Sequence, residues 1–132
     1  MLREVLTRTV KRFTKAVDAA VDAEDEQALH DVRKAAKRLR YTAEAAAPVL
    51  GARVRELIKA LKGVQEVLGD RQDTVVTRQL CHDLGIAAFA AGENAWTWGR
   101  LHALEEARSA EAEREFWQRW PELRPVLRSA VR

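Results

Sequence analysis

Apolar residues recur at spacings of three and four over much of the chain, which is the pattern of amphipathic helices. The first such stripe predicts a helix over about residues 2–22; it consists of Leu2, Val5, Leu6, Val10, Phe13, Val17 and Val21. A later stripe predicts a helix over about residues 52–68; it consists of Val54, Leu57, Leu61, Val64 and Leu68. No segment shows the period-two alternation of a half-buried strand. The pattern therefore predicts an all-α protein.

Polar, glycine and proline positions predict where the helices end. Asp22 to Asp25 is a polar break, in which Asp25 is suited to cap a second helix that ends near Ala47, because Pro48 disfavours helix at the residue before it. Gly69 is predicted to end the third helix, since glycine is common just past a helix. A short fourth helix follows, with Asp70 and Asp73 as a weak capping box, an apolar stripe of Val76, Leu80 and Leu84, and a stop at Gly85.

Residues 86–91 are predicted to add one helical turn, and a last long helix runs from about Asn94 to Trp120, just before Pro121. The tail from Pro121 is expected to fray. The polar middle of this last helix, residues 105–115, is expected to project from the bundle or to lie exposed. The tryptophans at the two ends of the helix suit either a core or a partner surface. Short connections predict an up-down bundle of four to five helices that forms one domain over residues 1–132.

The second helix carries a concentrated basic face. Its sequence from His30 to Glu44 is H-D-V-R-K-A-A-K-R-L-R-Y-T-A-E, with five cations in eight residues. At about 100° per residue, one side of this helix is polar and the opposite side is apolar. The polar side holds His30, Arg33, Lys34, Lys37, Tyr41 and Glu44, flanked by Arg38 and Arg40. The apolar side holds Leu29, Val32, Ala36, Leu39 and Ala43.

The cations of this helix repel one another, because residues at i and i+4 are neighbours about 6 Å apart. No acid lies between Arg33 and Arg40, although alternating acids are usual on a solvated helix. A basic run is often only solvated surface, but this spacing favours an anionic ligand. Glu44 is expected to pair with Arg40 or Tyr41.

This basic helix resembles the signature of the CHAD family, the conserved-histidine α-helical domain. A second segment, L-K-G-V-Q-E-V-L-G-D-R-Q-D from Leu61 to Asp73, resembles the motif that follows it in that family. The resemblance implies an all-helical module, not an enzyme, that binds inorganic polyphosphate or related phosphate polyanions through a basic channel. The family has two similar halves, and this chain resembles the second half only. Two copies related by a twofold axis are therefore expected to rebuild a two-walled channel.

The predicted polyphosphate-binding residues lie on two helices. They are His30, Arg33, Lys34, Lys37, Arg38, Arg40 and Tyr41 on the second helix and Lys59 and Lys62 on the third. Arginine suits bidentate phosphate contacts and lysine supplies a mobile charge. His30 adds a pH-dependent donor. Asp73 is interpreted as a helix cap or as the partner that positions an arginine.

Composition and residue pattern limit which other functions are possible. A net charge of +3 is mild, but acids gather in segments 18–26 and 105–115. A single cysteine, Cys81, excludes an intrachain disulfide and is expected to be buried. The sets His82–Asp83 and His102–Glu105 are incomplete as metal sites, no catalytic triad is evident, and no cofactor is expected. No apolar run is long enough to span a membrane. The first residues lack the uninterrupted apolar core of a signal peptide, so a cytoplasmic protein is expected. An association with polyphosphate granules is consistent with that location.

Two alternative functions remain open at this point. The same cations suit a nucleic-acid backbone, although Tyr41 is the only stacking aromatic on the face. A scaffold bundle that docks an acidic protein also fits.

Overall fold

The computed structural model describes residues 1–23 and 25–132, and Glu24, inside the predicted polar break, lies outside the described residues. The described chain forms four helices and no strand. They are α1 (Leu2–Val21), α2 (Gln27–Leu50), α3 (Ala52–Ala90) and α4 (Trp96–Ala130). The prediction of an all-α bundle is confirmed, with four helices and not five. No helix in the described part is both long and apolar enough to cross a membrane.

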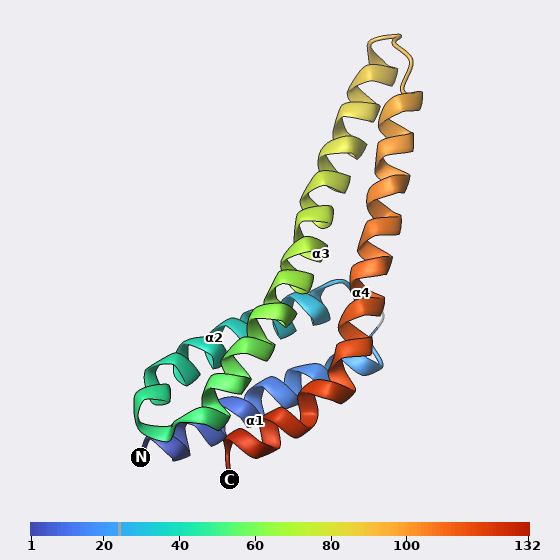
Figure 1. Cartoon of the computed structure of the whole chain (residues 1–132). Coiled ribbons are helices and arrows are strands. Elements are labelled where there is room, and N and C mark those ends of the chain that lie inside the picture. Colours follow the sequence, from blue (N-terminus) through green and yellow to red (C-terminus); the bar gives the residue numbers. More distant parts are fainter. Residues whose placement is uncertain (24) are drawn as a thin grey trace.

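The helices form a bundle from which a two-helix arm extends (Figure 1). The helices α1 and α2 pack with the first half of α3 and the second half of α4, and both chain termini lie at the end of the bundle away from the arm. The last part of α3 and the first part of α4 continue beyond the bundle as a hairpin. We call residues 75–104 the arm.

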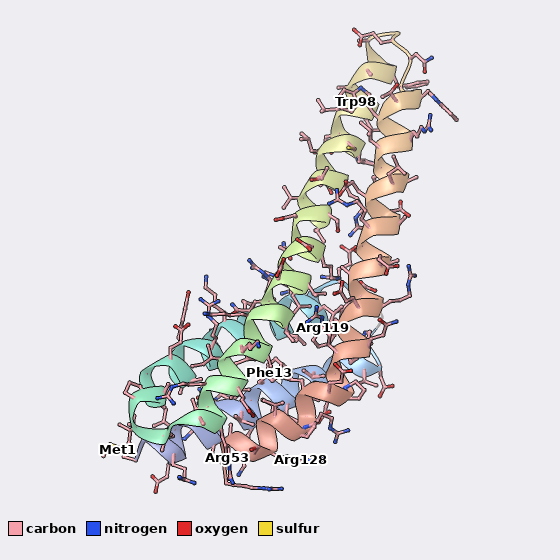
Figure 2. The ribbon with its side chains drawn as sticks, in the orientation of Figure 1. Met1, Phe13, Arg53, Trp98, Arg119 and Arg128 are labelled. Carbon is pink, nitrogen blue, oxygen red and sulfur yellow. The ribbon has the colours of Figure 1, made fainter. Side chains whose placement is uncertain are left out.

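The predicted apolar stripes supply the core of the bundle. The five residues predicted on the apolar side of the basic helix are buried: Leu29, Val32, Ala36, Leu39 and Ala43. The five stripe residues at the start of α3 are buried as well. Phe13 of α1 is fully buried and meets Trp120 of α4 edge to face, with ring centroids 6.0 Å apart. Figure 2 shows Phe13 between the helices of the bundle. Within the bundle, most residues of these stripes are buried, whereas the predicted stripe of Val76, Leu80 and Leu84 lies exposed on the arm.

The start of α2 is capped as predicted, but its end is not where Pro48 suggested. The side chain of Asp25 accepts a hydrogen bond of 2.9 Å from the Ala28 amide. The helix runs through Pro48 to Leu50, and Gly51, at φ 84°, ends it by donating to the Ala47 carbonyl. Pro48 lacks the N–H that would bond to the carbonyl four residues earlier, and only two residues of α2 follow it, so the loss is confined to the last turn.

The predicted breaks at Gly69 and Gly85 are wrong, because α3 is one continuous helix of 39 residues. Asp70 and Asp73 therefore lie inside a helix, and Asp73 is not a cap. The arm explains Gly85: a Cβ there would lie 3.3 Å from the Cβ of Trp98, so glycine allows α4 to approach closely. Figure 2 shows Trp98 near the distal end of the arm.

The predicted end of α4 at Trp120 and the frayed tail are also wrong. The helix continues through Pro121 and Pro125 to Ala130, with Leu123 and Leu127 buried against the bundle. This burial offsets the helical hydrogen bonds that the two prolines remove.

The tryptophans of α4 divide between the core and the surface. Trp120 is buried and Trp117 packs against the core, whereas Trp96 is 71% exposed. Cys81 is buried, as predicted.

The continuity of α3 gives a test at Gly69, where an added Cβ meets nothing within 4 Å. Because Gly69 lies in a helix interior, Gly69→Ala is expected to raise the free energy of unfolding by about 0.5–1 kcal/mol. Urea denaturation measures this change. A loss of stability would indicate instead that Gly69 ends a helix in the left-handed conformation that alanine disfavours.

Candidate polyanion-binding face

The basic residues of α2 lie opposite its buried row. The side chains of Lys34, Lys37 and Arg38 are exposed, and those of His30, Arg33 and Arg40 are half-buried. For the two arginines this follows from the helix, because Arg33 and Arg40 lie closest to the apolar row and Lys34 and Tyr41 lie farthest from it. His30 lies far from that row and contacts α3 instead. The cations therefore form a surface that ranges from partly desolvated to fully exposed.

The half-buried edge of this surface faces α3. The Nδ1 atom of His30 lies 3.1 Å from the Oε1 atom of Gln72, across a separation of 42 residues. With the amide oxygen as acceptor, Nδ1 carries the ring proton, and Nε2 is left for another partner. This contact fixes the register of the antiparallel pair α2 and α3. We call the line where they meet the seam.

The α3 side of the seam is formed by residues on the same side as Gln72. Stepping back from Gln72 by three, four and three residues reaches Gly69, Gln65 and Lys62, all within about 80° of Gln72 around the helix. Lys59 lies about 140° away from Gln72. Of the two lysines predicted on this helix, Lys62 thus borders the seam and Lys59 points farther out, and both are exposed.

Arg40 is held in place by its neighbours on α2. Its Nε lies 3.2 Å from a carboxylate oxygen of Glu44, which confirms the predicted pair, and its guanidinium lies 5.7 Å from the centre of the Tyr41 ring. The ion pair lacks good hydrogen-bond geometry, because Nε of Arg40 is a buried polar atom without a hydrogen-bond partner. Within the described residues, Oε1 of Gln65 is likewise a buried atom without a hydrogen-bond partner. The seam therefore contains polar groups that are not fully satisfied by the protein.

A second acid of α2, besides Glu44, counters the basic surface. Asp31 lies 3.4 Å from Nζ of Lys34. The hydrogen bond that Gln27 donates to its carboxylate, together with Lys34, holds the pKa of Asp31 below its ordinary value. Asp31 is therefore ionised at neutral pH and competes with any external anion for Lys34.

A buried arginine that sequence reasoning missed ties α3 to its surroundings. Arg71 is only 3% exposed; it donates to Glu113 of α4 at 3.0 Å and to the backbone carbonyl of Glu26 at 3.2 Å. Farther along α3, Arg78 pairs with the Glu26 carboxylate at 2.7 Å. Asp73, predicted to position an arginine, is exposed, and the arginine is positioned by Glu113 instead. Arg71 lies inside the second motif, which was the available signal.

The basic surface is open, whereas the clefts lie elsewhere. A cleft of about 480 Å³ lies between α1 and the start of α2, and one of about 640 Å³ is lined mainly by α3 residues of the arm, with Glu26 and His102. None of the nine predicted binding residues lines either of them. An elongated anion that follows a helix suits such a surface, because its charges repeat and need no enclosing pocket.

Comparisons with known proteins agree with the motifs. The CHAD domain family matches residues 1–82, which cover α1, α2 and most of α3. Two uncharacterized proteins of Mycobacterium tuberculosis, from two strains, are each 41% identical over 112 residues. That match covers 82% of this chain and 20% of each relative, so the chain spans about a fifth of their length. No solved structure matches the chain.

Proposed function

The chain belongs to the CHAD domain family, and on that premise we propose that it is a binding module for inorganic polyphosphate or similar phosphate polyanions. The observation that carries the proposal is the row of cations on α2, backed by a buried apolar row and bordered by the polar seam with α3. Successive cations along the row lie about 6 Å apart, which suits a ligand with a charge on every unit.

Each part of the surface has a role in this proposal. Arg33 and Arg40 are partly desolvated, so their charge-assisted hydrogen bonds to phosphate oxygens are stronger than those of exposed lysines. Lys34, Lys37 and Arg38 attract the chain from solvent, and Lys62 adds charge from α3. The contact with Gln72 sets the ring orientation of His30, and Nε2 donates to a phosphate oxygen when both ring nitrogens are protonated. We propose an accessory module without catalytic activity, acting in the cytoplasm and at polyphosphate granules.

Two other anionic partners compete with this proposal. A nucleic acid would engage the same cations, but Tyr41 is the only aromatic beside them to stack on bases. An acidic protein would dock through the charges without following the helix as a repeating chain does.

A competition titration separates the three partners. Labelled long-chain polyphosphate is bound to the protein and then displaced with unlabelled polyphosphate, DNA, RNA or an acidic peptide at matched ionic strength. Polyphosphate is expected to displace the label at the lowest charge-normalised concentration. Equal or better displacement by a nucleic acid or the peptide would overturn the proposal.

Removal of the competing acid gives a further prediction. Asp31→Asn is expected to strengthen polyphosphate binding by up to about fivefold, because Lys34 loses its intramolecular partner. Asp83→Asn is the control, since it makes the same charge change on the arm, away from the basic face. Equal gains in the two variants would show that affinity follows net charge and not this surface.

A further inference from the structure

The arm has an unusually apolar surface. Eight large apolar side chains in residues 75–104 are more than a third exposed: Val76, Leu80, Leu84, Ile86, Phe89, Trp96, Leu101 and Leu104. Phe89 and Trp96 are 77% and 71% exposed. Aromatic side chains offer about 150–250 Å² each, so these two alone expose on the order of 250 Å². Contiguous apolar patches larger than a few hundred Å² mark interaction sites on monomeric proteins, and the other six side chains add to this area.

Four leucines gather on one side of the arm. Val76, Leu80 and Leu84 follow one another at intervals of four residues, which places them on one side of α3. The close approach of Gly85 to Trp98 and the pairing of Arg71 with Glu113 fix the antiparallel register of α3 and α4. In that register Leu80 lies beside Leu104, and Leu84 lies close to Leu101. The side chains of α3 and α4 therefore form one continuous apolar strip, which we call the leucine face.

The opposite side of the arm is apolar too. A cleft of about 360 Å³ lies there between α3 and α4, and its lining includes Cys81, Ile86, Phe89 and Trp98. The arm is thus a two-helix hairpin that exposes apolar side chains on both sides, interspersed with polar ones.

The charges of the arm indicate its partner. Residues 75–104 hold two cations and two acids, so the arm is neutral, while the rest of the chain carries the whole net charge of +3. Arg78 is already paired with Glu26. A strongly acidic or basic partner finds no complement on this surface. A second copy of the arm is equally neutral and equally apolar, so it can approach without like-charge repulsion.

We propose that the arm docks against the arm of a second copy of this chain, with the leucine face at the centre of the contact. Two hairpins that each present an apolar side complete a four-helix bundle, with the side chains buried in its middle. A twofold axis satisfies the requirement that the same patch serves both copies. This contact goes beyond polyanion binding and needs no ligand, because it is apolar and is made by the arm and not by the basic face of α2.

Sedimentation velocity over a range from low to high micromolar protein tests the proposal at low and at high salt, without polyphosphate. A monomer–dimer equilibrium that persists at high salt is expected, since burial of apolar surface is not screened. Leu80→Glu with Leu104→Glu is expected to weaken it by at least a hundredfold. Val49→Glu is the control, because Val49 is 71% exposed but lies on α2.

Cross-linking supplies an independent readout that does not depend on a destabilising change. Thr97→Cys places a thiol on the exposed surface of the arm, and Arg53→Cys places one at the far end of the bundle. A short bis-maleimide is expected to link the first variant between copies and to leave the second unlinked. A monomer at all concentrations would overturn the proposal. So would a dimer that survives the double glutamate change or one that forms only with polyphosphate.

Discussion

The triple variant Arg33→Gln, Lys37→Gln, Arg40→Gln is expected to lose polyphosphate binding at physiological salt while remaining folded. Each change removes one charge-assisted contact, worth at least about 1 kcal/mol. Three such losses together weaken binding by a factor on the order of 100 or more. The loss is larger if the partly desolvated arginines contribute more than the exposed lysine.

Stability is expected to change little in this variant. All three positions lie outside the buried row of α2, and glutamine is a good helix former. The Arg40–Glu44 pair lies near the surface and contributes at most about 1 kcal/mol, while relief of like-charge repulsion acts in the opposite direction. A melting curve and a polyphosphate titration measure the two effects separately.

The matched control is Arg100→Gln, Arg108→Gln, Arg114→Gln on α4. It removes the same net charge from exposed positions outside α2. Binding is expected to fall only slightly in this control. If both triple variants lose binding equally, net charge and not the basic face determines affinity. If the α2 variant unfolds, the cations support the fold through contacts other than those described here.

Within the bundle, the buried sides of the helices could be predicted from the sequence because burial of an amphipathic helix depends on a local repeat, but the same repeat in Val76, Leu80 and Leu84 is exposed on the arm. Leu29, Val32 and Leu39 are buried because they recur at helical spacing, whatever the partner helix is. The same repeat placed the cations on the outer side of α2. Local chemistry also identified the Asp25 cap and the Arg40–Glu44 pair, since both lie within four residues.

The helix ends could not be predicted, because packing between distant segments overrides local preference. Gly69 and Gly85 weaken a helix by about 1 kcal/mol each, which predicted breaks in α3. The neighbouring α4 packs along this helix. At Gly85, the absence of a Cβ lets Trp98 of α4 pack closely, and this packing offsets the low helix propensity of glycine. Pro121 is tolerated because Leu123 and Leu127 are buried beyond it. No pattern within a short window contains this information.

The second side of the candidate site depends on tertiary register in the same way. The sequence placed Lys59 and Lys62 together as one wall, but only the contact between His30 and Gln72 shows which side of α3 borders the seam. Gln65 and Gln72 are seven residues apart in the second motif, two turns on one side, and this spacing was a usable signal. The role of Arg71 was not visible, because its partner Glu113 is 42 residues away.

Glu113→Ala is expected to lower the free energy of unfolding more than most single substitutions at partly exposed positions. Glu113→Ala leaves the guanidinium of Arg71 buried with only the Glu26 carbonyl as partner. Breaking a buried pair by removing one partner costs about 3–5 kcal/mol, and the 42% exposure of Glu113 reduces this to about 2–3 kcal/mol. Urea denaturation followed by circular dichroism measures the change.

Glu115→Ala on the same helix is the matched control, because it breaks a pair with Arg119 in which both side chains are more than 40% exposed. Its cost is expected to stay below about 1 kcal/mol. In an Arg71→Met background, Glu113→Ala is expected to cost almost nothing, because no buried charge is then left without its partner. Equal costs for Glu113→Ala and Glu115→Ala would contradict this account. A large difference that disappears with Arg71 would show that this buried arginine joins α3 and α4 at the base of the arm, where the bundle gives way to the unsupported hairpin.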